Sequence, residues 1–331
     1  MLSSRGPEMR KEPHHANTLR QLFPAGEIYA VSDCESLVVN AAHYGLTGVR
    51  LADSSKLPPE ANVALLLCRS QVSSDLRNIF RRAKVLVIPI SSFDPAPEAA
   101  LYTLKLVMLT DYRSACEQGR YWVDNIKNQA GPIVFYTDDA GKADSGPERT
   151  DLVCTLSDDL SAATWLEPVI EPGQWVSVGS LCEVSLTTES HDQPHQFSLD
   201  GTAIASGVLV ARDRHCTEAG DIRIRAGDKL RRELVAAAPI SLRLDAGVLT
   251  EIRAAGRDYT AAVCEATNPE HGLQALELGI GTNQGVLPEV QWQINSQLNE
   301  GAGPVHIGFG EGVTGAHMDF IVAESSHRFT V

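Results

Sequence analysis

A chain of 331 residues, of which 43% are apolar and 21% charged, is long enough for two globular domains and too hydrophobic to be disordered. Its 42 acidic and 28 basic residues give a net charge of −14, which disfavours nucleic acid and anionic membranes as partners. Seven cysteines without any Cys-x-x-Cys spacing argue against a disulfide framework or a structural zinc knot, and favour a reduced, cytoplasmic protein.

Ahead of the first predicted domain, residues 1–20 are expected to form a flexible N-terminus. They mix charged residues, proline and histidine, and they lack the apolar core of a signal peptide. No run in the chain approaches the roughly 18 apolar residues of a membrane-spanning helix. We therefore expect a soluble protein without a membrane partner.

Residues 21–148 are predicted to form an α/β domain. Three segments have the strand, helix, strand order of a parallel βαβ unit: an apolar run at 63–68, an amphipathic stretch at 74–83 and an apolar run at 85–90. Helical periodicity follows over 97–126 with a break in the middle, and a strand is predicted at 132–136. Residues 137–147 are rich in Asp, Gly, Lys, Ser and Pro, which places a domain boundary near residue 148.

Residues 149–331 are predicted to form a mixed α+β, β-rich domain. Short β-rich runs occur at 174–178, 182–187, 203–211, 240–244 and 248–252. The last two flank a compact turn, in which Gly247 supplies the positive φ that a hairpin needs. Short helices are predicted at 229–237 and 259–267. The fold class is therefore an α/β N-terminal part followed by a β-rich C-terminal part.

Four segments of the C-terminal part place potential metal ligands among apolar, strand-like residues: 181–184, 276–283, 305–310 and 316–320. The ionisable residues of the last three are Glu277, His306, His317 and Asp319. Buried carboxylates normally have a partner, and one cation can neutralise several of them. Residues i and i+2 of a strand point to the same face, so the spacing of His317 and Asp319 suits one ion. Mixed nitrogen and oxygen ligands favour Zn²⁺, Mn²⁺, Co²⁺ or Fe²⁺ over Ca²⁺.

The order of these motifs resembles the family of thermophilic metallo-aminopeptidases. The motifs are Cys-Glu-Val at Glu183, Glu-Leu-Gly-Ile-Gly-Thr-Asn at Glu277, Val-His-Ile-Gly-Phe-Gly at His306, and His-Met-Asp-Phe at His317 and Asp319. The sequence is also similar to that family's relatives, the iron-dependent dihydroxypyridine dioxygenases. The resemblance implies that all five residues are ligands of a divalent metal, with Glu277 as the bridge between two ions. It also implies a homodimer.

Two functions remain open. The first is a metal-dependent enzyme, a hydrolase or a dioxygenase, that acts on a peptide or a small aromatic substrate. The second is a non-catalytic peptide-binding protein, for example in peptide natural-product biosynthesis. The aminopeptidases have a metal-site tyrosine shortly after the histidine that corresponds to His306, and residues 310–313 contain none, which favours the second function. Taken singly, His306 also fits a core histidine, and Glu183 fits an exposed strand face.

Overall fold

The computed structural model describes residues 15–128, 131–137, 149–158, 160–188 and 195–330. Most of the expected flexible N-terminus and the predicted boundary loop before residue 148 lie outside these residues. Residues His15–Gln21 form a 3₁₀ helix, η1. The division of the chain near residue 148 stays a prediction. None of the described helices is both long and apolar enough to cross a membrane.

The N-terminal part is built on a five-stranded sheet with the order β2-β1-β3-β4-β8, in which all neighbours are parallel. Its strands are β1 (Ile28–Ser32), β2 (Thr47–Arg50), β3 (Asn62–Leu66), β4 (Lys84–Ile88) and β8 (Trp175–Ser177). With α2 (Ser74–Ile79), strands β3 and β4 form the predicted βαβ unit. Apolar side chains cover both faces of the sheet, as a parallel sheet requires.

Helices α3 (Pro97–Leu109) and α4 (Tyr112–Asn128) confirm the broken helix predicted over 97–126. Pro97 begins α3, where its missing N–H costs nothing. After α3 ends, the carboxylate of Asp111 accepts a hydrogen bond from the Ser114 N–H in the first turn of α4. The remaining helices are α1 (Glu35–Asn40), α5 (Val178–Cys182), α6 (Glu218–Ala236) and α7 (Thr260–Thr267), with 3₁₀ helices η2 (Ala41–Tyr44), η3 (Leu51–Lys56), η4 (Ile90–Ser92), η5 (Gln284–Glu289) and η6 (Gln297–Ala302).

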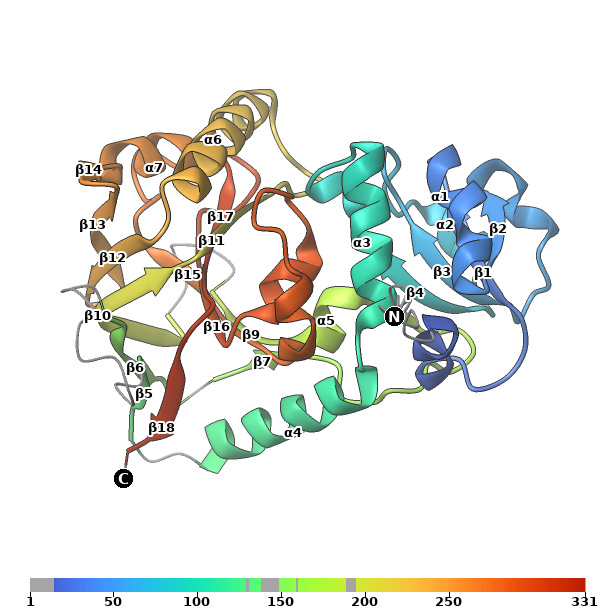
Figure 1. Cartoon of the computed structure of the whole chain (residues 1–331), viewed down its shortest axis with the longest axis horizontal. Coiled ribbons are helices and arrows are strands. Elements are labelled where there is room, and N and C mark those ends of the chain that lie inside the picture. Colours follow the sequence, from blue (N-terminus) through green and yellow to red (C-terminus); the bar gives the residue numbers. More distant parts are fainter. Residues whose placement is uncertain (1–14, 129–130, 138–148, 159, 189–194, 331) are drawn as a thin grey trace, which may run out of the picture.

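Two antiparallel sheets make up the C-terminal part (Figure 1). The seven-stranded sheet comprises, in order, β14 (Arg257–Asp258), β13 (Val248–Ala254), β12 (Ile240–Asp245), β10 (Phe197–Ala205), β6 (Asp151–Leu156), β5 (Ile133–Tyr136) and β18 (Ser326–Phe329). The six-stranded sheet comprises β11 (Gly207–Ala211), β17 (His317–Val322), β16 (Val305–Phe309), β15 (Ala275–Gly281), β9 (Glu183–Thr187) and β7 (Ala162–Ala163). The predicted fold class is confirmed.

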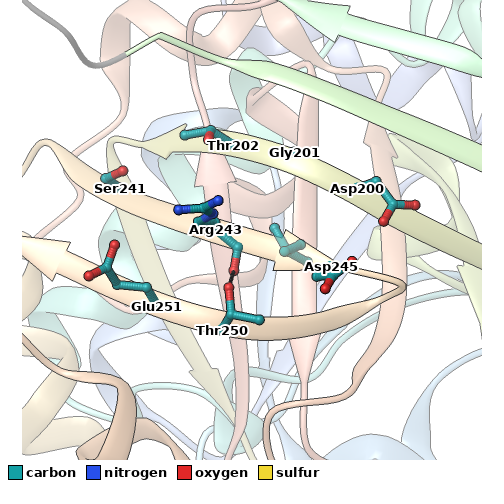
Figure 2. A pocket seen from close by; sticks show the side chains of 9 residues that line it. Asp200, Gly201, Thr202, Ser241, Arg243, Asp245, Thr250 and Glu251 are labelled. Carbon is teal, nitrogen blue, oxygen red and sulfur yellow. Dashed lines mark hydrogen bonds between the residues drawn. The ribbon is translucent and has the colours of Figure 1, made fainter.

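The outer face of the seven-stranded sheet is polar. Thr202, Arg243 and Thr250 lie on neighbouring strands there and line a broad concavity of about 960 Å³ (Figure 2). Strands β12 and β13 form the predicted hairpin, and Gly247 in its turn has a φ of +79°. Alternation along each strand sends every second side chain to the opposite face.

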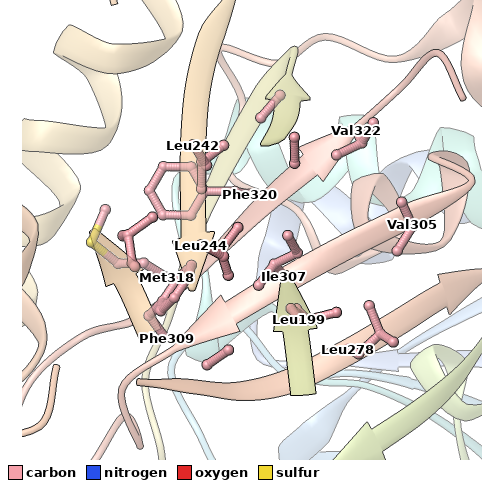
Figure 3. Close-up of a cluster of buried hydrophobic side chains, with 14 of the residues drawn as sticks. Leu199, Leu242, Leu244, Leu278, Val305, Ile307, Phe309, Met318, Phe320 and Val322 are labelled. Carbon is pink, nitrogen blue, oxygen red and sulfur yellow. The ribbon is translucent and has the colours of Figure 1, made fainter. Parts of the chain in front are cut away.

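The inner faces of the two antiparallel sheets pack against each other and form the main core of the C-terminal part. Leu199 and Leu242 come from the seven-stranded sheet, and Ile307, Met318 and Phe320 come from the six-stranded sheet (Figure 3). These side chains are all fully buried. The core therefore occupies one face of the six-stranded sheet and leaves the opposite face for other side chains.

Three local predictions differ from the structure. The strand predicted at 132–136 exists as β5, but it joins the antiparallel sheet, and β8 from the later part of the chain joins the parallel sheet. The single run predicted at 203–211 splits into the end of β10 and β11, which belong to different sheets. The helix predicted at 229–237 is the end of the longer α6, whose first turn is capped by the Thr217 hydroxyl. The first half of α6 is rich in charged residues, and these hide the apolar periodicity that predicts a helix.

Candidate metal centre

All five predicted ligand residues lie on the same face of the six-stranded sheet, opposite the core. The strands that carry them, β9, β15, β16 and β17, are neighbours in that sheet. Glu277 pairs with Gly308, and Gly308 in turn pairs with Asp319 across the next strand. Met318 points into the core between His317 and Asp319, as the i, i+2 spacing predicts. The pairing register therefore gathers residues that are far apart in the sequence.

Glycines on this face make room for the larger side chains. A Cβ at Gly279 would lie 1.9 Å from Cε1 and 2.0 Å from Nε2 of His306. A Cβ at Gly308 would lie 2.7 Å from Oδ1 of Asp319 and 2.9 Å from Cε1 of His317. These glycines are needed because the cluster lies directly against their Cα atoms.

His317 and Asp319 form the tightest pair of the cluster. Nε2 of His317 lies 2.9 Å from Oδ1 of Asp319, whose side chain is only 1% exposed. The other ring nitrogen, Nδ1, donates a hydrogen bond to the carbonyl oxygen of Gly310 at 2.7 Å. Such a bond fixes the ring orientation and directs Nε2 into the site, which is the usual arrangement for a metal-binding imidazole.

Glu277 lies between the two imidazoles. Its Oε2 is 3.2 Å from Nε2 of His317, and its Oε1 is 3.8 Å from Nε2 of His306. The hydroxyl of Ser185 donates a hydrogen bond of 2.5 Å to the same Oε1 and holds the carboxylate in place. Glu277 therefore contacts both imidazoles, and its role as a bridge between two ions stays a prediction.

His306 and Glu183 lie at the inner end of the cluster. Nε2 of His306 is 3.8 Å from Oε2 of Glu183, and the His306 side chain is 1% exposed. Among the described residues, three buried atoms here have no hydrogen-bond partner: Oε2 of Glu183, Nδ1 of His306 and Oδ2 of Asp319. Buried polar atoms without partners are rare, and a cluster of them indicates space for an ion or for water.

Glu300 is a member of the cluster that the sequence reasoning missed. It lies in η6 and is 7% exposed. Burial raises the pKa of its carboxyl well above the usual value, and the charges of Asp319, Glu183 and Glu277 raise it further. Its segment, Asn-Glu-Gly-Ala-Gly, has no strand-like apolar pattern, so burial of this carboxyl is invisible in the sequence.

The two imidazoles carry the positive charge that balances these carboxylates. Burial lowers the pKa of His306, but Glu277, Glu183 and Asp319 outweigh it and raise that pKa to about 9. Burial also lowers the pKa of His317, but the negative charges of Asp319 and Glu277, with Asp319 contributing most, hold that pKa well above its usual value. Burial raises the pKa of Glu183 to about 8 against the opposing charge of His306. Burial also raises the pKa of Glu277, but hydrogen bonds and charge from the two imidazoles outweigh it and hold that pKa well below the usual range.

The donor set fits a divalent metal. Glu277, His317 and Asp319 each offer one ligand atom, and these atoms all lie within 4.8 Å of one another. The unpartnered Oδ2 of Asp319 and the orientation of His317 by Gly310 support this fit. His306 adjoins this group through Glu277, and Glu183 adjoins His306. A mixed nitrogen and oxygen set suits a first-row transition metal or zinc.

The turn after β16 supplies backbone to the site. Gly310 and Gly312 have φ values of +80° and +75°, which favour glycine. A Cβ at Gly310 would lie 2.2 Å from the carbonyl oxygen of Ala316. The turn is therefore built for close backbone packing, and Gly310 contributes its carbonyl oxygen to His317.

Comparisons with known proteins identify a family. Residues 25–330 match the model of the family described as "Crocagin biosynthetic protein CgnE/B". Among solved structures, wild-type AmpT from Thermus thermophilus matches with a TM-score of 0.46 and 13% sequence identity, covering 95% of this chain and 92% of that chain. No curated protein matches the sequence significantly.

Proposed function

The chain belongs to the family of crocagin biosynthetic proteins CgnE/B, and from this premise we propose that it is a non-catalytic peptide-binding protein of peptide natural-product biosynthesis. Its ligand in this proposal is an extended segment of the precursor peptide. One observation carries the proposal: a pocket with aliphatic and polar lining residues lies directly beside the strand at one edge of the six-stranded sheet.

This pocket, the edge pocket, has a volume of about 390 Å³. Val123 and Ile126 of α4 line one wall, and Leu156, Leu160 and Ala162 line the other. Ala162 belongs to β7, which pairs with β9 on one side and is the last strand of its sheet. The polar side chains of Lys127, Thr155, Ser157 and Asp158 also line the pocket.

An edge strand and a neighbouring pocket together form the arrangement in which proteins bind extended peptides. The unpaired backbone of the edge offers main-chain hydrogen bonds, and the pocket selects one side chain of the peptide. β7 has only two residues, which limits pairing with unrelated strands. The aliphatic side chains of the lining offer apolar contact to one side chain of the peptide, and the polar lining residues offer it hydrogen bonds.

We expect Leu160→Glu to weaken binding of the precursor peptide at least about tenfold, because the new carboxylate loses hydration when the pocket fills. The measurement is fluorescence anisotropy, with the labelled precursor peptide titrated with the full chain.

Ile222→Glu is the matched control, since Ile222 is 67% exposed on α6 and tolerates a charge. A third variant, His317→Ala with Asp319→Ala, removes two cluster residues and should leave peptide affinity within about twofold. Equal affinities of Leu160→Glu and Ile222→Glu would exclude the edge pocket as the peptide site.

A metal-dependent enzyme is the second candidate function. The observation that favours it is the cluster itself, in which Oδ2 of Asp319 is buried without a partner and His317 is oriented by Gly310. In this candidate, Glu277, His317 and Asp319 hold the ion, with His306 and Glu183 beside it. A bound divalent ion supplies a Lewis acid that polarises a carbonyl or activates water. The chain's own contribution is to orient His317 and to bury His306 beside it.

For this second candidate, elemental analysis of protein purified without chelator should find close to one equivalent of Zn, Mn, Co or Fe per chain. The His317→Ala, Asp319→Ala variant should lose most of this metal, because two of the three closest ligands are gone. Less than about a tenth of an equivalent in the unaltered protein would contradict the enzymatic function and agree with peptide binding alone.

A further inference from the structure

A second pocket lies at the other end of the molecule, where the strands of the parallel sheet end. This switch-point pocket has a volume of about 550 Å³. Ser32 and Asp33 line it at the end of β1, residues 50–52 at the end of β2, and Arg69 after the end of β3. Glu35, the first residue of α1, also lines the pocket. The switch-point pocket shares no lining residue with the cluster or with the edge pocket.

The strand order explains why a cavity forms at this place. In the order β2-β1-β3-β4, the chain leaves β1 for β2 on one side and leaves β3 for β4 on the other. Connections that diverge from adjacent parallel strands leave a crevice beyond their carboxyl ends, and ligands of such sheets bind there. The topology and the cavity are separate observations that indicate the same place.

The carboxylate of Asp33 is already used by the backbone. Its Oδ1 accepts the N–H of Cys68 at 2.8 Å, and its Oδ2 accepts the N–H groups of Arg69 at 2.9 Å and Ser70 at 2.6 Å. These bonds fix the loop after β3 against the end of β1. As a result, Asp33 positions Arg69 at the pocket, and its carboxylate oxygens face these three N–H groups.

Two guanidinium groups of the pocket keep donors available. Arg50 donates from Nε and Nη2 to the carboxylate of Glu35 at 3.0 and 2.9 Å, which leaves its Nη1 without a bond among the described residues. The guanidinium of Arg69 has no hydrogen bond or ion pair within the described part of the chain. Both carboxylates of the pocket are therefore engaged, whereas arginine N–H groups remain open on two of its sides.

We propose that the switch-point pocket binds a small anionic molecule through a carboxylate or phosphate group, held by Arg69 and Nη1 of Arg50. The planar fork of N–H groups in arginine matches both of these anions. The cavity is larger than either group alone, so the rest of the ligand lies against Leu51. This site is independent of the proposed peptide binding, and it gives the N-terminal part a function of its own.

Titration of the full chain with inorganic phosphate and with citrate tests the proposal, followed by ¹H–¹⁵N NMR at constant ionic strength. We expect saturable shifts at the amides of Asp33, Arg50 and Arg69 with at least one probe. A response to phosphate alone assigns a phosphate-bearing ligand, and a response to citrate alone assigns a carboxylate.

Arg69→Gln should weaken that binding at least about tenfold, because it removes the open charge. The matched control is Arg81→Gln, since Arg81 is exposed and precedes the amino end of β4, whereas the pocket lies at the carboxyl ends of the strands. The amide spectrum of each variant reports whether it remains folded. The absence of saturable shifts with both probes, or equal weakening by the two variants, would overturn the proposal.

Discussion

Gly279→Ala should lower the free energy of unfolding by about 3 kcal/mol and distort the cluster, although it adds a single methyl group. The new Cβ would lie 1.9 Å from the ring of His306, which is 1% exposed and cannot move towards solvent. The clash forces either the backbone of β15 or the imidazole out of place. Urea denaturation at neutral pH measures the loss of stability.

Gly285→Ala is the control for this prediction. A Cβ at Gly285 meets no atom within 4 Å, so this variant should unfold within about 1 kcal/mol of the unaltered protein. The double variant Gly279→Ala with His306→Ala should be less destabilised than the sum of the two single changes, since the ring that causes the clash is gone. Additive effects would show that crowding between these two residues is not the cause.

Phe320→Ala should cost about 3–5 kcal/mol of stability, because it opens a cavity between the two antiparallel sheets. Phe320 is fully buried and packs edge-to-face on Phe309, with ring centroids 5.8 Å apart. It lies on β17 directly after Asp319, so the same strand carries a core residue on one face and a cluster residue on the other. Chemical denaturation monitored by circular dichroism provides the measurement.

Val248→Ala serves as the comparison, since Val248 is 38% exposed and should cost less than about 1 kcal/mol. Phe320→Leu keeps most of the apolar volume and should cost less than Phe320→Ala. A loss below about 1 kcal/mol for Phe320→Ala would contradict the packing of the two sheets described above.

The cluster is compatible with both candidate functions for an electrostatic reason. The carboxylates raise the pKa values of His306 and His317. The protonated imidazoles therefore balance part of the buried negative charge when no metal is bound. A protein that only binds peptide can therefore keep the cluster stable without a metal. An ion at Glu277, His317 and Asp319 would replace these protons as the balancing charge.

Local patterns predicted much of the secondary structure. The βαβ unit around β3 and β4, the break between α3 and α4, and the hairpin at Gly247 all depend on residues close in sequence. The membership of strands in sheets was not predictable in this way. β5 and β8 look alike as short apolar runs, yet each joins the sheet of the other part of the chain. That exchange depends on long-range pairing, which leaves no trace in local periodicity.

The candidate site also has features that depend on local sequence and features that depend on long-range pairing. The spacing of His317 and Asp319 was sufficient to place them on one face, because side chains alternate along any strand. The approach of Glu277 and His306 to this pair depends on the register of four strands, and Glu300 enters from a 3₁₀ helix with no motif at all. Both proposed ligand pockets likewise form where separate elements meet. The sequence by itself determined which side chains share a strand face, whereas the tertiary structure decided which faces and loops come together, because pairing and packing act between distant residues.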